Sequence, residues 1–169
     1  MRSALIMGGV VLAVIIIEVL VFLYSGNLNT IPSVAIENLP TITVVPFTKL
    51  VQGMQSSIST RINYLITSTD ELEKLWKMIS ASEKIPTVDF TRYSVAAVFA
   101  GEKPTNDYTI AVSRVEDTNV RTVIVTLAQP TASCKPKHSI TAPYELIVLP
   151  KTSLALTHED RIATTSCSQ

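Results

Sequence analysis

Two apolar, β-branched runs, residues 95–100 and 108–115, constrain the fold of this 169-residue chain more than any other feature. The first run is apolar throughout, with small residues sharing one face, and in the second Tyr108, Ile110 and Val112 alternate with Thr109, Ala111 and Ser113. Both patterns are typical of strands in a sheet. A short polar segment, 101–107, separates the two runs. Its Pro104 fixes φ, and Asn106 and Asp107 tolerate the backbone angles of tight turns. We therefore predict an exposed hairpin loop held between two core strands.

Further strands are predicted where β-branched or aromatic residues lie between turn residues, at 42–45, 59–67, 120–127 and 144–149. In the strand over 94–100, small side chains such as Ser94 and Ala96 share one face. We expect a helix to pack on that face, because small residues permit a close approach. In the strand over 120–127 we expect Arg121 to lie near solvent.

The helix is predicted to begin at Ser68. The sequence Ser68-Thr69-Asp70-Glu71 is a capping box, in which the Ser68 hydroxyl accepts from the Glu71 amide and the Glu71 carboxylate accepts from the Ser68 amide. The apolar residues that follow at helical spacing, which form one stripe, are Leu72, Leu75, Trp76 and Ile79. We interpret Trp76 as a core residue. The predicted fold class is α+β, with a small antiparallel sheet of five or six strands and this one capped amphipathic helix.

Residues 4–24 are apolar except for Glu18, and a helix of about 21 residues spans the roughly 30 Å hydrocarbon core of a bilayer. A cleaved signal peptide has a shorter apolar region, so a single transmembrane signal anchor is favoured over a removed signal. Arg2 precedes this span and the next basic residue is Lys49. This places the N-terminus in the cytoplasm and the rest of the chain outside the plasma membrane. Glu18 either pairs with a cation of a partner helix or lies protonated near the outer interface.

The predicted organisation has four parts: the anchor over 1–24, a linker over 25–43, a domain over 44–151 and a polar C-terminal tail over 152–169. The chain holds two cysteines, Cys134 and Cys167. In an oxidising compartment two cysteines indicate one disulfide, although two free thiols are the alternative.

The composition and motifs argue against several classes of function. The formal net charge is zero, which gives no electrostatic case for binding nucleic acid. The sequence contains no nucleotide-binding loop, nucleophile elbow or metal-spaced His/Cys cluster. We interpret His158-Glu159-Asp160 as a solvated charge cluster. We therefore predict a protein that is not an enzyme and that uses no cofactor or metal.

A family resemblance is carried by Asp89 to Val95 and by Val98-Phe99-Ala100-Gly101-Glu102-Lys103-Pro104-Thr105 followed by Tyr108. These residues resemble the C-terminal domain family of the protease complex subunit PrcB, and the likeness extends over roughly 44–151. The chain departs from the family pattern at Asn106 and Asp107, where two glycines are usual. Asn and Asp are the residues best able to replace glycine at positive φ. The loop is also similar, over a shorter stretch, to that of chagasin-type inhibitors of cysteine proteases.

The resemblance, the predicted anchor and the missing catalytic motifs together indicate a membrane-anchored extracytoplasmic protein-binding module, an accessory or stabilising subunit of a protease or envelope complex. The partner-binding residues predicted for it are Gly101, Glu102, Lys103, Pro104, Thr105, Asn106, Asp107 and Tyr108. Two alternatives remain open. One is a protease inhibitor that uses this loop as a wedge, and the other is a structural subunit that self-assembles through the apolar N-terminal segment with Glu18.

Overall fold

The computed structural model describes residues 40–79, 81, 84–131, 134 and 138–166. Residues 40–169 form one compact unit. Its elements in chain order are β1 (Thr43–Val44), β2 (Thr48–Gly53), β3 (Ile62–Ile66), α2 (Thr69–Trp76), β4 (Tyr93–Phe99), β5 (Thr109–Asp117), β6 (Arg121–Pro130), β7 (Tyr144–Pro150) and β8 (Leu156–Thr165).

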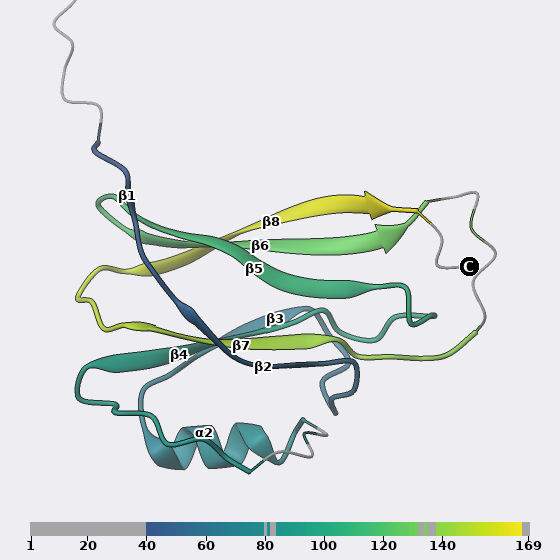
Figure 1. Ribbon diagram of the computed structural model, residues 1–169, viewed down its shortest axis with the longest axis horizontal. Helices are drawn as coiled ribbons and strands as arrows, with labels where there is room; N and C mark the ends of the chain where they lie inside the picture. Colours follow the sequence, from purple (N-terminus) through teal and green to yellow (C-terminus); the bar gives the residue numbers. More distant parts are fainter. Residues whose placement is uncertain (1–39, 80, 82–83, 132–133, 135–137, 167–169) are drawn as a thin grey trace, which may run out of the picture. The chain divides into compact units, whose positions relative to one another are not determined.

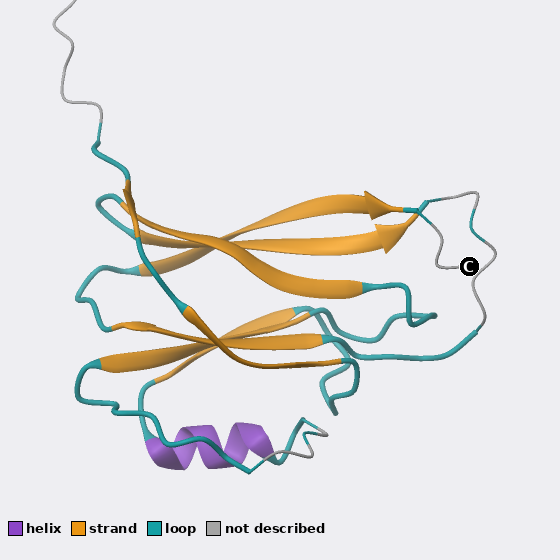
Figure 2. Ribbon diagram, viewed as in Figure 1, coloured by secondary structure: helices purple, strands orange, loops and turns teal. Residues whose placement is uncertain are grey.

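The strands form two four-stranded sheets that pack face to face (Figures 1 and 2). Sheet A has the order β1-β5-β6-β8, and sheet B has the order β2-β7-β4-β3. All neighbours are antiparallel except β6 and β8, which are parallel. The helix α2 lies on the face of sheet B that points away from sheet A, so the unit has three layers (Figure 1).

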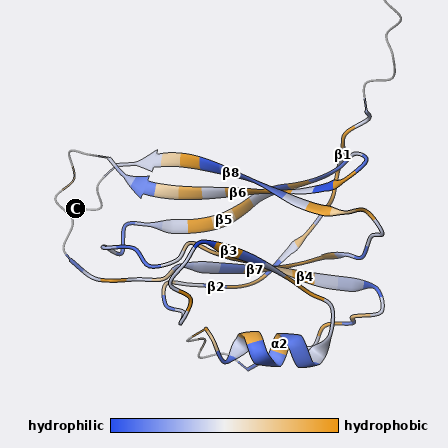
Figure 3. Cartoon of the chain, turned by 180° about the vertical axis from the view of Figure 1, so that it is seen from behind, coloured by the Kyte–Doolittle hydropathy of each residue, from blue (hydrophilic) through white to orange (hydrophobic). Residues whose placement is uncertain are grey.

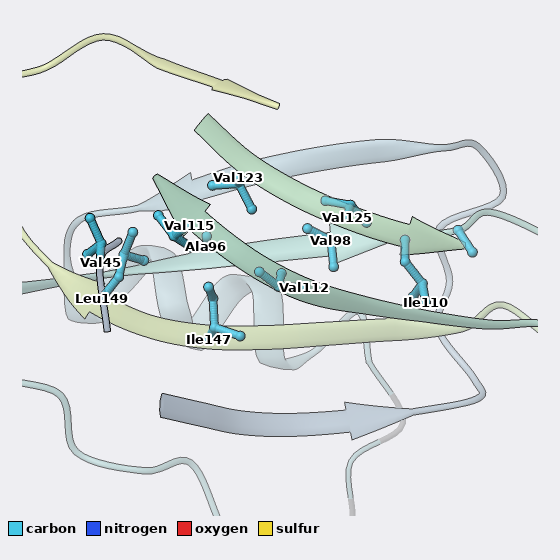
Figure 4. Close-up of a cluster of buried hydrophobic side chains, with 11 residues drawn as sticks. Val45, Ala96, Val98, Ile110, Val112, Val115, Val123, Val125, Ile147 and Leu149 are labelled. Carbon is cyan, nitrogen blue, oxygen red and sulfur yellow. The ribbon is translucent and has the colours of Figure 1, made fainter. Parts of the chain in front are cut away.

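The layers enclose two apolar clusters. The first lies between the sheets and includes Val98, Val112, Val125 and Ile147 (Figure 4). The second lies between sheet B and α2. The two central strands of sheet B, β4 and β7, are therefore buried on both faces, which explains why they are apolar along nearly their whole length.

The helix begins at the predicted cap but covers a different face of the sheet. Ser68 Oγ accepts from the Glu71 amide at 3.3 Å, as predicted. The Glu71 carboxylate accepts from the Thr67 amide at 2.7 Å, and this bond is the first cause of a lowered pKa of Glu71. The stripe of α2 is buried, Trp76 included, whereas the opposite face is polar (Figure 3).

The helix packs on the face of β4 that carries Val95, Ala97 and Phe99. The expectation that it would cover the small-residue face is wrong, because sheet A covers Ala96 and Val98. Bulky groups from α2 fill the space around Ala97, while the opposite small face accommodates the side chains of a second sheet.

The predicted fold class is wrong. The structure is mostly β, with two four-stranded sheets in place of one sheet of five or six strands. One helix can bury only one face of an apolar sheet, so the other face needs a second layer. The predicted anchor over 4–24, with Glu18, lies outside the described residues. Among the residues that are described, no helix is long and apolar enough to cross a membrane.

Arg121 is buried and not near solvent as expected, with 4% of its surface exposed. Its Nε and Nη2 donate to the two carboxylate oxygens of Asp117, each at 2.7 Å, and Nη1 donates to the carbonyl of Pro150. The hydrogen bond from Arg121 is the first cause of a lowered pKa of Asp117. The hydrogen bond to Pro150 links this ion pair of sheet A to the end of β7 in sheet B.

Candidate functional site

The loop 101–108 connects the two sheets. It leaves β4 of sheet B and enters β5 of sheet A (Figure 1). The prediction of a hairpin loop is therefore wrong, because a hairpin joins neighbouring strands of one sheet. Local sequence signals a change of direction at Pro104 but does not say which strand the chain will pair with next.

Gly101 starts the loop in a conformation that only glycine adopts easily. Its φ is +73°, and a Cβ added there would lie 2.7 Å from the carbonyl oxygen of Ser59 and 2.7 Å from the carbonyl carbon of Thr60. The next residue, Glu102, donates its amide to the same Ser59 oxygen at 2.9 Å. Gly101 therefore lets the loop pass in direct contact with the chain that leads into β3.

The middle of the loop pairs with residues 139–141, far along the chain. The amide of Lys103 donates to the Thr141 carbonyl at 2.8 Å, and the amide of Thr141 donates to the Lys103 carbonyl at 3.0 Å. Thr141 Oγ1 donates to the Thr105 carbonyl at 2.9 Å, and both threonines are 3% exposed. The Ser139 amide donates to the Pro104 carbonyl at 3.1 Å. The loop backbone is therefore fixed by the body of the domain.

The Asn106-Asp107 pair does not use positive φ, contrary to the expectation from the sequence. No residue other than glycine has a positive φ in the described part of the chain. The Asp107 amide instead approaches the hydroxyl of Thr105, at 3.4 Å. A Thr side chain that accepts from the amide two residues on stabilises such a turn without left-handed backbone.

The loop presents several side chains to solvent. Glu102, Pro104 and Asn106 are exposed, and Lys103 and Tyr108 are half-buried. The Lys103 ammonium lies 5.9 Å from the centroid of the Tyr108 ring, within the range of a cation–π contact.

Ile140 adds an apolar side chain beside this loop, with 71% of its surface exposed. It precedes Thr141, the bridge partner of Lys103. The residue was missed in the sequence because 129–140 is mostly polar. Its signal is a lone β-branched residue just before the predicted strand over 144–149. We call the exposed and half-exposed side chains of loop 101–108, together with Ile140, the signature surface, which comprises Glu102, Lys103, Pro104, Asn106, Asp107, Tyr108 and Ile140.

A buried carboxylate at the β2–β5 edge of the sandwich has a structural role. Glu145 is 1% exposed, and its Oε2 accepts from the Val112 amide at 2.5 Å. The Lys49 ammonium lies 2.8 Å from Oε1, at ion-pair distance but outside the alignment of a hydrogen bond. Gln52 Nε2 donates to the Ile110 carbonyl at 3.1 Å. These side chains satisfy the part of the β5 edge that the two-residue strand β1 leaves uncovered.

The remaining candidate groups lie apart from the loop. Cys167 lies outside the described residues, so the predicted disulfide between Cys134 and Cys167 stays a prediction. His158 and Asp160 lie on β8. In the described ranges no group of three or more His, Cys, Asp or Glu side chains is placed to hold a metal ion.

The fold and the site define a helix-covered β-sandwich with a loop whose backbone is held by hydrogen bonds and whose side chains are exposed. Residues 94–150 match the family described as PrcB C-terminal. The match runs from β4 to the end of β7 and contains the whole signature surface. No curated protein and no solved structure matches the chain.

Proposed function

We propose that this protein is a non-enzymatic binding module that associates with a protein partner in a protease or envelope complex. The contact is made by the signature surface. The similarity of residues 94–150 to the PrcB C-terminal family supports a protease-complex-associated module.

The observation that carries this proposal is the contrast between backbone and side chains in the loop. The hydrogen bonds to Thr141 and Ser139 fix its backbone, while Pro104 and Ile140 remain exposed. A surface that is ordered before binding loses little conformational entropy when a partner docks. The exposed Ile140 and the charged residues Glu102 and Lys103 of the loop fit a contact with an apolar centre and a polar rim.

The proposal is tested by affinity purification from native membranes solubilised in mild detergent. We compare the wild type with Ile140→Lys and with Ile162→Lys, because Ile140 and Ile162 have similar exposed fractions of 71% and 68%. We expect a stoichiometric partner with the wild type, recovery lowered about ten-fold by Ile140→Lys, and no change with Ile162→Lys. A wild type that recovers no stoichiometric partner, or equal losses in both variants, contradicts the proposal.

We also propose that the unit over 40–169 lies on the outer side of the plasma membrane. Support comes from Arg2 ahead of the apolar segment 4–24, because positive charge stays on the cytoplasmic side of a membrane span. Protease added to intact cells tests this location. Cleavage of the unit before the cells are lysed is expected, and complete protection until lysis contradicts it.

The geometry of the loop gives the inhibitor hypothesis no support. A wedge must project into a cleft of the protease, whereas here the middle of the loop is paired with Thr141 and Thr105 is buried. The self-assembly hypothesis based on Glu18 concerns a segment outside the described residues.

A further inference from the structure

The two sheets of the sandwich have four edge strands, and three of them carry features that hinder pairing with another strand. β1 has only two residues. β2 has a register shift between Lys49 and Val51. In β8, His158 and Asp160 are aligned with inward-facing residues of β6, which puts charged or polar groups on the interior face of this edge. Bulges, short strands and inward charges are the usual protections of sheet edges.

The fourth edge strand, β3, has none of these features. Ile62–Ile66 contains no charge, proline or glycine, and its pairing with β4 shows no register shift. Two of its large side chains are exposed, Tyr64 by 37% and Leu65 by 45%. An unprotected apolar edge of this kind is a template for a further strand.

The backbone groups that β3 offers follow from the hydrogen bonds on the other side of β4. The Ala100 amide donates to the Pro143 carbonyl, and the Arg92 carbonyl accepts from the Lys151 amide. The backbone amides and carbonyls of even-numbered residues in β4 therefore point toward β7. Those of odd-numbered residues point toward β3, where their partners are Ile62, Tyr64 and Ile66.

It follows that the amides and carbonyls of Asn63 and Leu65 point away from the sheet. The next outward amide, that of Thr67, is taken by the Glu71 carboxylate. The free edge of β3 therefore offers two donors and two acceptors, all from Asn63 and Leu65.

A groove of about 460 Å³ lies between the sheets beside β3. It is lined by Leu65 of β3, by Ala96 and Val98 of β4 and by Leu156 of β8, among others. At the groove, the Arg61 guanidinium donates to the Asp160 carboxylate with Nε to Oδ2 at 3.0 Å, so these two charges cancel. The groove is complementary to uncharged side chains.

We propose that β3 is a self-association edge whose occupant is β3 of a second copy of this chain. The strands pair antiparallel about a two-fold axis through Tyr64. This register places Asn63 opposite Leu65 of the second copy, so the free donors and acceptors of each strand meet those of the other in four hydrogen bonds. Tyr64 lies opposite Tyr64, and Ile62 lies opposite Ile66.

The charges of the paired residues and the placement of their side chains both favour this occupant. Every pair in the register is uncharged, so no like charges face each other. The Asn63 and Leu65 side chains lie on the groove side of β3. The side chains of Ile62, Tyr64 and Ile66 continue the apolar face that α2 covers. The two sheets B become one sheet of eight strands.

Sedimentation of the full-length protein over a dilution series in mild detergent tests the proposal. The variant Leu65→Lys places an ammonium at the edge, and Met78→Lys is its control because Met78 has a similar exposed fraction of 42%. We expect Leu65→Lys to weaken association about ten-fold or more, since it desolvates a charge without a partner, and Met78→Lys to leave it unchanged. The variant Leu65→Pro removes only an outward amide and is expected to weaken association as well.

Cross-linking tests the register. Paired residues that do not exchange hydrogen bonds have Cα atoms about 4.5 Å apart, within the range of a disulfide. We therefore expect Tyr64→Cys to form a disulfide-linked dimer on mild oxidation and Asn63→Cys to form none, with the linked peptides identified by mass spectrometry. Equal urea midpoints show that the variants are folded.

A monomer at every concentration, association that Leu65→Lys leaves unchanged, or a cross-link at Asn63→Cys without one at Tyr64→Cys overturns the proposal. If the protein is a monomer and still recovers a partner through the signature surface, the self-association edge is refuted and the proposed function stands.

Discussion

Replacing Gly101 by alanine separates the structural role of the loop from its binding role. The φ of +73° costs a residue with a Cβ about 1–2 kcal/mol. The new Cβ also lies 2.7 Å from backbone atoms of Ser59 and Thr60, which cannot rotate away as a side chain would. Overpacking of this kind costs about 1–3 kcal/mol. We expect Gly101→Ala to lower the free energy of unfolding by about 2–5 kcal/mol.

Urea unfolding followed by fluorescence measures this change, because Trp76 is the single tryptophan and is buried under sheet B. A lower midpoint with an unchanged slope indicates lost stability. Two further variants identify the cause. Gly101→Asn relieves part of the cost of positive φ but keeps the contact with Ser59, and Asn106→Ala changes an exposed residue of the same loop.

We expect Asn106→Ala to stay within about 0.5 kcal/mol of the wild type. If Gly101→Asn is as unstable as Gly101→Ala, the contact dominates; if it recovers most of the stability, the backbone angle dominates. A Gly101→Ala protein within about 0.5 kcal/mol of the wild type would refute the reasoning, because neither the angle nor the contact could then be as described.

Three other changes test the energetics of the fold. The lowered pKa of Asp117 adds stability that is present above about pH 4 and is lost as pH falls through the folded-state value. Asp117→Asn, which weakens the pair with Arg121, should therefore lose less stability than the wild type between pH 5 and pH 2 in urea titrations; an equal loss would contradict this. Ser68→Ala removes the cap of α2 and should lower the free energy of unfolding in urea by about 1 kcal/mol. No change would show that the cap is dispensable. Glu145→Ala leaves the buried Val112 amide without its acceptor and should cost about 2–4 kcal/mol in the same assay. A cost below about 1 kcal/mol would show that water replaces the carboxylate.

The sequence determined the features that depend on neighbouring residues. The start of α2 is set by Ser68, whose hydroxyl reaches the amide three residues on, and the burial of Trp76 follows from its place in the helical stripe. The strands around 93–99 and 144–150 follow from apolar runs between turn residues. The loop 101–108 was found as a candidate site because its motif lies within a single stretch of chain.

The tertiary structure decided every feature that depends on distant partners. The strand β8 has an exposed, charged sequence with no clear alternation, and it is a strand because β6 supplies its hydrogen bonds. Arg121 is buried because Asp117 and the Pro150 carbonyl surround it. Ile140 joins the candidate site because Thr141 pairs with Lys103.

Alternation in the sequence tells which residues share a face of a strand, but it does not tell which sheet the strand joins. That choice is made by hydrogen bonds and packing between segments far apart in the chain. For this reason the sequence identified the loop, and only the folded chain showed that it crosses between two sheets with its backbone fixed and its side chains exposed.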